Sequence, residues 1–339
     1  MKKKNIVVLG GGTGSFVILK GLTRYPVHLT AIVSMSDSGG SNKRIRDEFG
    51  LLPTSDIRSC LVALAAEDGE SELMRKLFMY RFEKGEGISG MTFGNLFMAA
   101  LSDILGSQKD AIAKTGQILR INGTVVPVTY TNTHLFAEYE NGLILNEEHF
   151  IDEPKHDGTL KINKLYLEPN GVANPDALQA IKEADYILIG PGDLYTSILP
   201  NVLVQGIAEA IKNSSAKKIY TLNLMTKYGQ TYGFSAQDHL RVLEKYLLHA
   251  PIDYVIVNDG LLPAEVLKLY EEQHEFPVKN DLEDSENLKV IREDFLGSEQ
   301  RTQSKSDALK RSLIRHNPEK LARAIMKIVE PSSNQVVGE

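Results

Sequence analysis

The stretch Ile6–Gly14 limits what this chain can fold into more than any other. It reads Ile-Val-Val-Leu-Gly-Gly-Gly-Thr-Gly and continues directly into Ser-Phe-Val-Ile-Leu. An apolar run of strand length that stops in glycines before a helical pattern predicts a strand joined to a helix by a loop nearly free of side chains. Glycine lets a ligand approach the backbone closely, and the following helix start presents free N–H groups. We therefore expect Gly11, Gly12, Thr13 and Gly14 to bind a phosphate or another anion.

The glycine loop alone does not identify the ligand. The dinucleotide fingerprint G-x-G-x-x-G would need a third glycine at the position of Ser15. A glycine turn can also serve only to let a strand and a helix pack tightly. We favour anion binding over that structural interpretation.

Short apolar runs of strand length recur along the chain, and each is followed by a polar loop and a helical pattern. They are Ile6–Leu9, Leu29–Val33, Tyr186–Ile189, Lys218–Leu222 and Tyr254–Val257. Strands that alternate with helices are typical of an α/β fold with a doubly wound, mostly parallel sheet and helices on both faces. Helices are predicted behind Pro53, from a capping box at Ser235 and Asp238, over residues 202–211 and over Pro318–Ile328.

The chain is expected to divide into a core, an insertion and a tail. Residues 1–113 and 171–330 are assigned to the α/β core, and residues 331–339 to a disordered tail without a periodic apolar face. Residues 114–170 carry Asn-Gly and Asp-Gly turn signals between short apolar runs at Val125–Tyr130, Leu143–Leu145 and Leu160–Leu167. This texture predicts a β-rich insertion or subdomain.

The loop after the second strand holds several candidate binding residues. Asp37 stands about where a ribose-binding acid is expected, and it is followed by Ser38 and by Gly39, Gly40 and Ser41, which could form an anion-binding nest of backbone N–H groups. Asp37 is also the candidate ligand if a magnesium ion is used.

Two later loops have the composition of binding loops. Pro191 and Gly192 begin a second glycine turn that continues to the hydroxyls of Thr196 and Ser197, which either bind oxygen atoms of a ligand or cap a helix. The segment 223–231 is polar and long for a loop between a strand and a helix. We expect both loops to contact the ligand.

Composition narrows the class of protein. The 339 residues include 38 lysines and arginines against 44 acids, and the resulting net charge of -6 argues against a nucleic-acid partner. The single cysteine, Cys60, excludes an internal disulfide and fits a cytoplasmic location. No run approaches the roughly 18 apolar residues of a membrane span, so no membrane insertion is expected. Metalloprotease, serine-hydrolase and P-loop motifs are missing from the sequence.

Taken together, the loops resemble one family. They read Gly10-Gly-Gly-Thr-Gly14, Asp37-Ser-Gly-Gly-Ser41, Gly94-Asn95-Leu96, Gly190-Pro-Gly192, Leu194-Tyr-Thr-Ser-Ile198, Pro200-Asn201, Asn223-Leu-Met-Thr226 and Arg315-His316-Asn317. From Lys4 to Val329 the chain resembles the YvcK-like gluconeogenesis factors, relatives of the CofD-like 2-phospho-L-lactate transferases.

The resemblance implies a Rossmann-like fold, a cytoplasmic location and binding of a UDP-sugar, in particular UDP-N-acetylglucosamine. The factors are associated with growth on gluconeogenic carbon sources, cell shape and wall synthesis, in a regulatory role. The transferase relatives move a phospholactyl group from a guanylyl donor onto a deazaflavin alcohol, with Mg2+. The matching motifs add Asn95, Asn223, Met225, Thr226 and Arg315 to the candidate ligand-binding residues.

The chain departs from the family pattern at positions that matter for catalysis. Ser38 replaces a second acid in the Asp37 loop, and Asn42-Lys43 replace Ser-Gly. Losing a carboxylate weakens the expectation of a metal. Met91-Thr92 and Gln230 stand where His-Ser and Glu are common, so two acid–base candidates are missing and catalysis is less expected.

Three functions remain open at this point. The first is a nucleotide-sugar sensor without a firmly expected cofactor, in which Arg315 adds charge from the C-terminal segment. The second is a transferase of phosphorus-containing groups, with Asp37 and Asp56 as candidate catalytic residues that hold Mg2+. The third is an NAD-binding protein, in which Asp37 would bind the ribose. A regulatory protein partner and a homo-oligomer both fit a regulator, but no sequence pattern identifies either.

Overall fold

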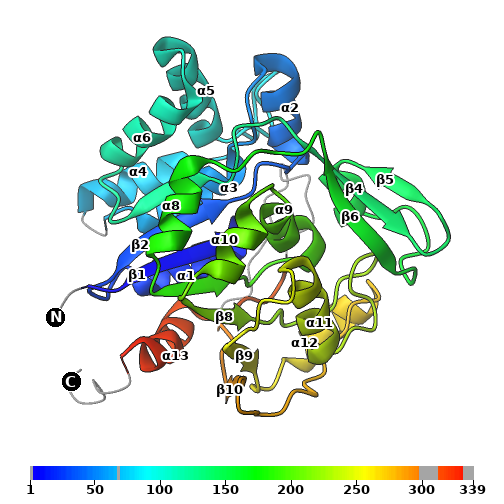
Figure 1. The fold of residues 1–339 in the computed structure, drawn as a ribbon. Helices are drawn as coiled ribbons and strands as arrows, with labels where there is room; N and C mark the ends of the chain where they lie inside the picture. Colours follow the sequence, from blue (N-terminus) through cyan, green and yellow to red (C-terminus); the bar gives the residue numbers. More distant parts are fainter. Residues whose placement is uncertain (1–2, 67–68, 298–311, 331–339) are drawn as a thin grey trace.

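A computed structural model describes residues 3–66, 69–297 and 312–330, and the predicted tail 331–339 lies outside them (Figure 1). Seven strands form one parallel sheet in the order β10-β9-β8-β7-β1-β2-β3. Their bounds are β1 Asn5–Gly10, β2 His28–Val33, β3 Thr124–Pro127, β7 Tyr186–Ile189, β8 Lys217–Thr221, β9 Tyr254–Asn258 and β10 Lys289–Glu293. The five strands expected from the sequence all belong to this sheet.

Helices cover both faces of the sheet, as predicted (Figure 1). They are α1 Gly12–Leu22, α2 Gly40–Phe49, α3 Ser55–Leu64, α4 Gly69–Met79, α5 Phe93–Leu105, α6 Gln108–Ile118, α8 Pro175–Glu183, α9 Leu199–Val202, α10 Ile207–Asn213, α11 Ala236–Tyr246, α12 Ala264–Glu271 and α13 Pro318–Val329. The capping box predicted at Ser235 and Asp238 is present at the start of α11. None of the described helices combines the length and the apolar composition needed to cross a lipid bilayer.

The centre of the sheet is buried on both sides. Ile6, Val7, Val8 and Leu9 of β1 are each at most 2% exposed, and the last three residues of β7, Ile187–Ile189, are fully buried. Strands of a parallel sheet that are covered on both faces read as continuous apolar runs without alternation. This burial explains why the short runs in the sequence identify the strands.

The strand order reverses between β1 and β7, which are neighbours in the sheet. The chain proceeds from β1 toward β3 on one side and from β7 toward β10 on the other. At such a switch point the loops beyond the carboxyl ends of the two strands leave in opposite directions, and a crevice opens between them. The glycine loops at Gly11–Gly14 and Gly190–Gly192 follow these two strands.

The β-rich segment is smaller than the sequence predicts. An antiparallel sheet is formed by β4 His134–Tyr139, β5 Ile144–Asn146 and β6 Ile162–Glu168, with the short helix α7 Glu148–Asp152 between β5 and β6. The expectation of a hairpin strand at Val125–Tyr130 is wrong, because Thr124–Pro127 pairs in parallel with β2 at the edge of the large sheet. α6 also extends to Ile118, past the expected boundary at residue 114.

The helix expected over residues 202–211 is broken. The chain forms a π-helix, η1, at Leu194–Ile198, then the short α9, and α10 begins only at Ile207. Gly206 interrupts the helix with a φ of 96°, a left-handed conformation that glycine adopts without strain. Thr196 and Ser197 lie within η1, next to the glycine turn.

Replacing Gly21 with alanine should test how tightly α1 packs against α13. A Cβ at Gly21 would overlap the carbonyl oxygen of Pro318 and lie 2.8 Å from the Cβ of Ala322. Overpacking of this kind costs about 1–3 kcal/mol, more than alanine gains in helix propensity. We expect thermal unfolding to show this loss for Gly21→Ala, whereas Ala100→Ser at an exposed position of α5 should change stability by about 0.5 kcal/mol or less. An unchanged melting temperature for Gly21→Ala would contradict the packing described.

Candidate functional site

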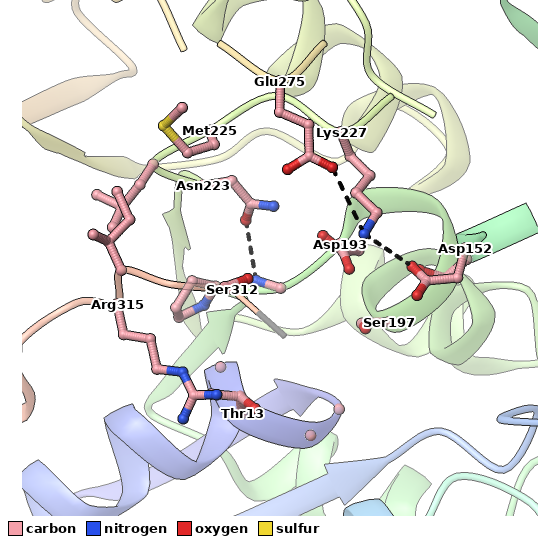
Figure 2. A pocket seen from close by; sticks show the side chains of 18 of the residues that line it. Thr13, Asp152, Asp193, Ser197, Asn223, Met225, Lys227, Glu275, Ser312 and Arg315 are labelled. Carbon is pink, nitrogen blue, oxygen red and sulfur yellow. Dashed lines mark hydrogen bonds and ion pairs between the residues drawn. The ribbon is translucent and has the colours of Figure 1, made fainter. Parts of the chain in front are cut away.

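A pocket of about 230 Å³ opens at the switch point of the sheet (Figure 2). Its walls come from the loops after β1, β2, β7 and β8, from α7 of the small sheet, and from the segments that follow α12 and precede α13. Ligands of open α/β sheets bind in this place, beyond the carboxyl ends of the strands. The pocket is therefore the candidate functional site.

The start of α1 forms the floor of the pocket. Gly11 is the N-cap residue and makes no side-chain capping bond. Among the described residues, no backbone carbonyl accepts a hydrogen bond from the N–H groups of Gly12, Thr13 and Gly14, and the Asp56 carboxylate lies against Gly11 and Gly12. Unpaired N–H groups and the positive end of the helix dipole favour a bound anion. This is the arrangement that the glycine loop predicts.

The two glycine loops touch each other. A Cβ at Gly14 would overlap the carbonyl oxygen of Pro191, so only glycine permits this approach. A Cβ at Gly11 would similarly overlap a carboxylate oxygen of Asp56. The backbone N–H of Gly192 donates to Oδ1 of Asn223 at 3.1 Å and thereby ties the β7 loop to the β8 loop. Three segments far apart in the sequence are thus fixed around one space.

The wall built by the β8 loop carries a buried cation. Lys227 Nζ lies 3.8 Å from Oδ1 of Asp152 and 3.9 Å from Oε1 of Glu275, and Asp193 lies beside them (Figure 2). Burial alone would lower the pKa of Lys227, but these three carboxylates raise it, so the side chain stays charged. Burial raises the pKa of Asp193 to about 6, although Lys227 partly opposes this.

The small sheet positions α7 in this same wall, to which α7 contributes Asp152 and Glu148. The backbone N–H of Ser38 donates to Oε2 of Glu148 at 3.3 Å, and that of His149 donates to Oγ of Ser38 at 3.1 Å. Burial raises the pKa of Glu148 well above its usual value, and Asp37 and Asp152 raise it further. Glu148 therefore holds a proton more readily than an ordinary carboxyl group.

The segment before α13 completes the site. The Tyr270 hydroxyl accepts hydrogen bonds from the backbone N–H groups of Leu313 and Ile314, at 2.9 and 3.3 Å, which holds this segment against α12. Arg315 extends toward Thr13 (Figure 2). Burial lowers the pKa of His316 to about 4, so its ring is neutral at pH 7. Arg315 thus adds positive charge near the start of α1.

Most residues expected at the site line this pocket. They are Gly11, Gly12, Thr13, Gly14, Asp37, Asp56, Pro191, Gly192, Thr196, Ser197, Asn223, Met225, Thr226 and Arg315. They come from six different loops and helix starts, so their convergence depends on the tertiary fold.

Five expected residues lie outside the pocket lining: Ser38, Gly39, Gly40, Ser41 and Asn95. Their polar groups are used inside the protein. The N–H of Gly39 donates to Oδ1 of Asp37 at 2.8 Å, and the Asn95 amide donates to the hydroxyls of Ser41 and Ser55, both at 3.0 Å. We interpret these residues as supports of the Asp37 loop.

Asp37 is itself held by its own loop. Its Oδ1 accepts the hydrogen bond from Gly39, and its Oδ2 accepts one from Nδ2 of Asn42 at 2.6 Å. This use of both oxygens is typical of a turn that stabilises itself. It weakens the interpretation of Asp37 as a ribose-binding acid of an NAD site.

Sequence reasoning missed about half of the lining. The missed residues are Val17, Glu148, His149, Asp152, Asp193, Leu224, Lys227, Tyr270, Gln273, Glu275, Ser312, Ile314 and His316. Asp193 and Lys227 lie inside loops that were singled out, so their charge was a usable signal. The residues of α7 and of the segment after α12 carry no local pattern that links them to the glycine loops. Within residues 3–66, 69–297 and 312–330, no three histidine, cysteine or acidic side chains are placed to hold a metal ion.

Comparison with known proteins agrees with the fold and with the motifs. The profile of the family described as 2-phospho-L-lactate transferase CofD matches residues 6–296. A relative from Aquifex aeolicus is 42% identical over 337 residues, which cover 97% of this chain and 98% of the relative. The gluconeogenesis factor of Bacillus subtilis is 36% identical over 332 residues, which cover 97% of this chain and 99% of the factor. The chain belongs to the CofD-like gluconeogenesis factor family.

A solved structure of this family has the same architecture. A crystal structure of a protein from Bacillus halodurans superimposes with a TM-score of 0.85 at 37% sequence identity, and the match covers 96% of this chain and 100% of that one. Family membership confirms the resemblance that the sequence motifs indicate.

Replacing Asp193 with asparagine should remove a pH-dependent loss of stability. The pKa of Asp193 is about 6 in the folded protein against 3.8 for an ordinary aspartate, so the folded state keeps a proton that the unfolded state has lost. Stability from this group is present below about pH 4 and is lost as pH rises through 6. We expect urea unfolding to show that the free energy of unfolding of the wild type falls between pH 4 and pH 7.5 by on the order of 1–3 kcal/mol relative to that of Asp193→Asn.

The exposed residue Asp103 provides the matched control for this experiment. Asp103→Asn should track the wild type across the same pH range. If Asp193→Asn tracks the wild type as well, Asp193 does not carry the buried charge described here.

Proposed function

We propose that this protein binds a nucleotide-sugar of the UDP-N-acetylglucosamine type in the switch-point pocket and acts as a regulator. In this role it links carbon metabolism during growth on gluconeogenic carbon sources to cell shape and wall synthesis, in the cytoplasm. The single observation that carries the binding proposal is the start of α1, where Gly12, Thr13 and Gly14 line the pocket and their N–H groups donate to no backbone carbonyl of the described residues.

A diphosphate is the ligand group that fits the N-terminus of α1. Its negative oxygens can accept hydrogen bonds from Gly12, Thr13 and Gly14, and the helix dipole stabilises the charge. Arg315 lies on the same side of the pocket and supplies a full positive charge (Figure 2). Its guanidinium can donate two parallel hydrogen bonds to a phosphate.

A regulatory role, rather than catalysis, is supported by how the polar groups are engaged. Both oxygens of Asp37 accept hydrogen bonds within their loop. Gln230, which lies in the polar loop after β8, donates from its amide to Oδ1 of Asp152 at 3.1 Å. An amide cannot act as a general acid or base. The regulatory output would then pass to a protein partner or to a second copy of the chain.

Calorimetric titration with UDP-N-acetylglucosamine tests the proposal directly. We expect saturable heat and a rise in melting temperature with ligand concentration, because a ligand that binds only the folded state stabilises it. Arg315→Gln should weaken binding at least about tenfold, since hydrogen bonds to charged groups contribute about 1.5–3 kcal/mol.

Arg323 lies exposed on α13 and provides the matched control, so Arg323→Gln should bind as the wild type does. No heat and no thermal shift with the wild type at millimolar ligand would sink the proposal.

A second candidate function is a transferase of phosphorus-containing groups. It is favoured by one observation, which is that Asp37 and Asp56 both line the pocket, with Asp56 against the start of α1. One or two protein carboxylates together with substrate phosphates suffice to hold Mg2+. Bound Mg2+ would supply charge stabilisation for the transferred group, while this chain's own residues orient the donor.

Turnover of a UDP-linked or GDP-linked donor in the presence of Mg2+ distinguishes the two candidates. The regulatory proposal predicts no turnover above the background of a protein-free control. Turnover that is present in the wild type and stops in Asp37→Asn would establish the transferase instead. Product release followed by chromatography is a sufficient measurement.

A further inference from the structure

The wall around Lys227 has no role in holding a diphosphate on α1, yet it is the most highly charged part of the pocket. Lys227 is contributed by the β8 loop, Asp193 by the β7 loop, Asp152 by α7 and Glu275 by the segment after α12. Figure 2 shows this group on one side of the pocket and Arg315, extending toward Thr13, on another. We call these four residues the Lys227 cluster.

The ammonium group of Lys227 has hydrogen-bonding capacity to spare. Its distances of 3.8 and 3.9 Å to Asp152 and Glu275 exceed the 2.7–3.2 Å of an N–H···O hydrogen bond. No described residue accepts a hydrogen bond from Nζ, although the side chain is only 18% exposed. The ammonium carries three donors, and because it is partly exposed at the pocket wall these donors can bond to water or to a ligand.

The charge of the cluster restricts which ligand group can occupy it. Three carboxylates and one ammonium give a net charge of about -2 when all are ionised. A second phosphate or a carboxylate would be repelled, because like charges in a poorly solvated site cost free energy. The remaining fit is an uncharged group that both donates and accepts hydrogen bonds. Hydroxyl groups do both, since they donate to the carboxylates and accept from the ammonium.

We propose that the Lys227 cluster binds the hydroxyl-rich, uncharged end of the ligand and that Lys227 determines the preference for a sugar-linked diphosphate over the bare nucleotide. This inference rests on the proposed nucleotide-sugar binding. It orients the ligand, with its diphosphate on the start of α1 and its sugar against the wall formed by α7 and the β8 loop. The small antiparallel sheet then takes part in sugar recognition through Asp152.

The test compares two ligands that share the uridine diphosphate: one carries the sugar, and the other has a free terminal phosphate oxygen in its place. UDP and UDP-N-acetylglucosamine are titrated calorimetrically into the wild type, Lys227→Met and the control Lys155→Met, whose lysine is exposed and outside the pocket lining. We expect the wild type to prefer UDP-N-acetylglucosamine at least about tenfold, or about 1.4 kcal/mol. Lys227→Met should lose that preference and bind UDP within about twofold of the wild-type affinity. Lys155→Met should behave as the wild type does.

Affinity for UDP reports whether each variant is folded. Should Lys227→Met not fold, Lys227→Gln carries the test, and a smaller loss confined to UDP-N-acetylglucosamine is expected, because its amide still donates. An equal loss of affinity for both ligands would show that Lys227 contacts the phosphates. No loss of affinity for either ligand would show that Lys227 does not contact the ligand. Either result overturns this inference while nucleotide binding stands. A wild type that binds neither ligand overturns the proposed function and this inference with it.

Discussion

The close approach of two glycine turns at the point where the strand order reverses is the constraint on which the site depends. Gly14 packs against the Pro191 carbonyl so tightly that a methyl group would not fit. The buried amide of Asn201 donates to the carbonyl oxygens of Gly10 at 3.2 Å and Ser197 at 2.9 Å and so joins the two turns a second time. These contacts fix the β7 loop beside α1, and Gly12, Thr13 and Gly14 of its first turn line the pocket. Any side chain at Gly14 would separate the two loops and displace the first turn of α1.

The site is a composite of two kinds of structure. The parallel sheet supplies backbone groups, namely the N–H donors of α1, and these suit any anion of the right size. Side chains that can distinguish ligands come from the additions to the sheet: Asp152 from the small antiparallel sheet, Glu275 from the segment after α12, and Arg315 from the segment before α13. We infer that the sheet provides affinity for phosphate and the additions provide specificity.

Features that depend on local sequence could be predicted from the sequence, whereas contacts formed only in the tertiary fold could not. The strands were readable because β1 and its neighbours are buried on both faces, and the glycine loops because their composition is local. Thr124–Pro127 was misassigned because a four-residue apolar run looks the same in a hairpin as at the edge of a parallel sheet. Asp152 and Glu275 could not be found, because only tertiary packing brings them to Lys227. Gly39 was expected to face a ligand, and instead its N–H is occupied by Asp37.

The central claim is that the open N–H groups at the start of α1 receive the phosphates of a nucleotide-sugar. An electron-density map of crystals grown with UDP-N-acetylglucosamine tests it most directly. The account predicts diphosphate oxygens within hydrogen-bonding distance of the backbone nitrogens of Gly12, Thr13 and Gly14, with Arg315 on the same phosphates. A diphosphate bound elsewhere, with those nitrogens bonded to water or to protein atoms, would contradict it.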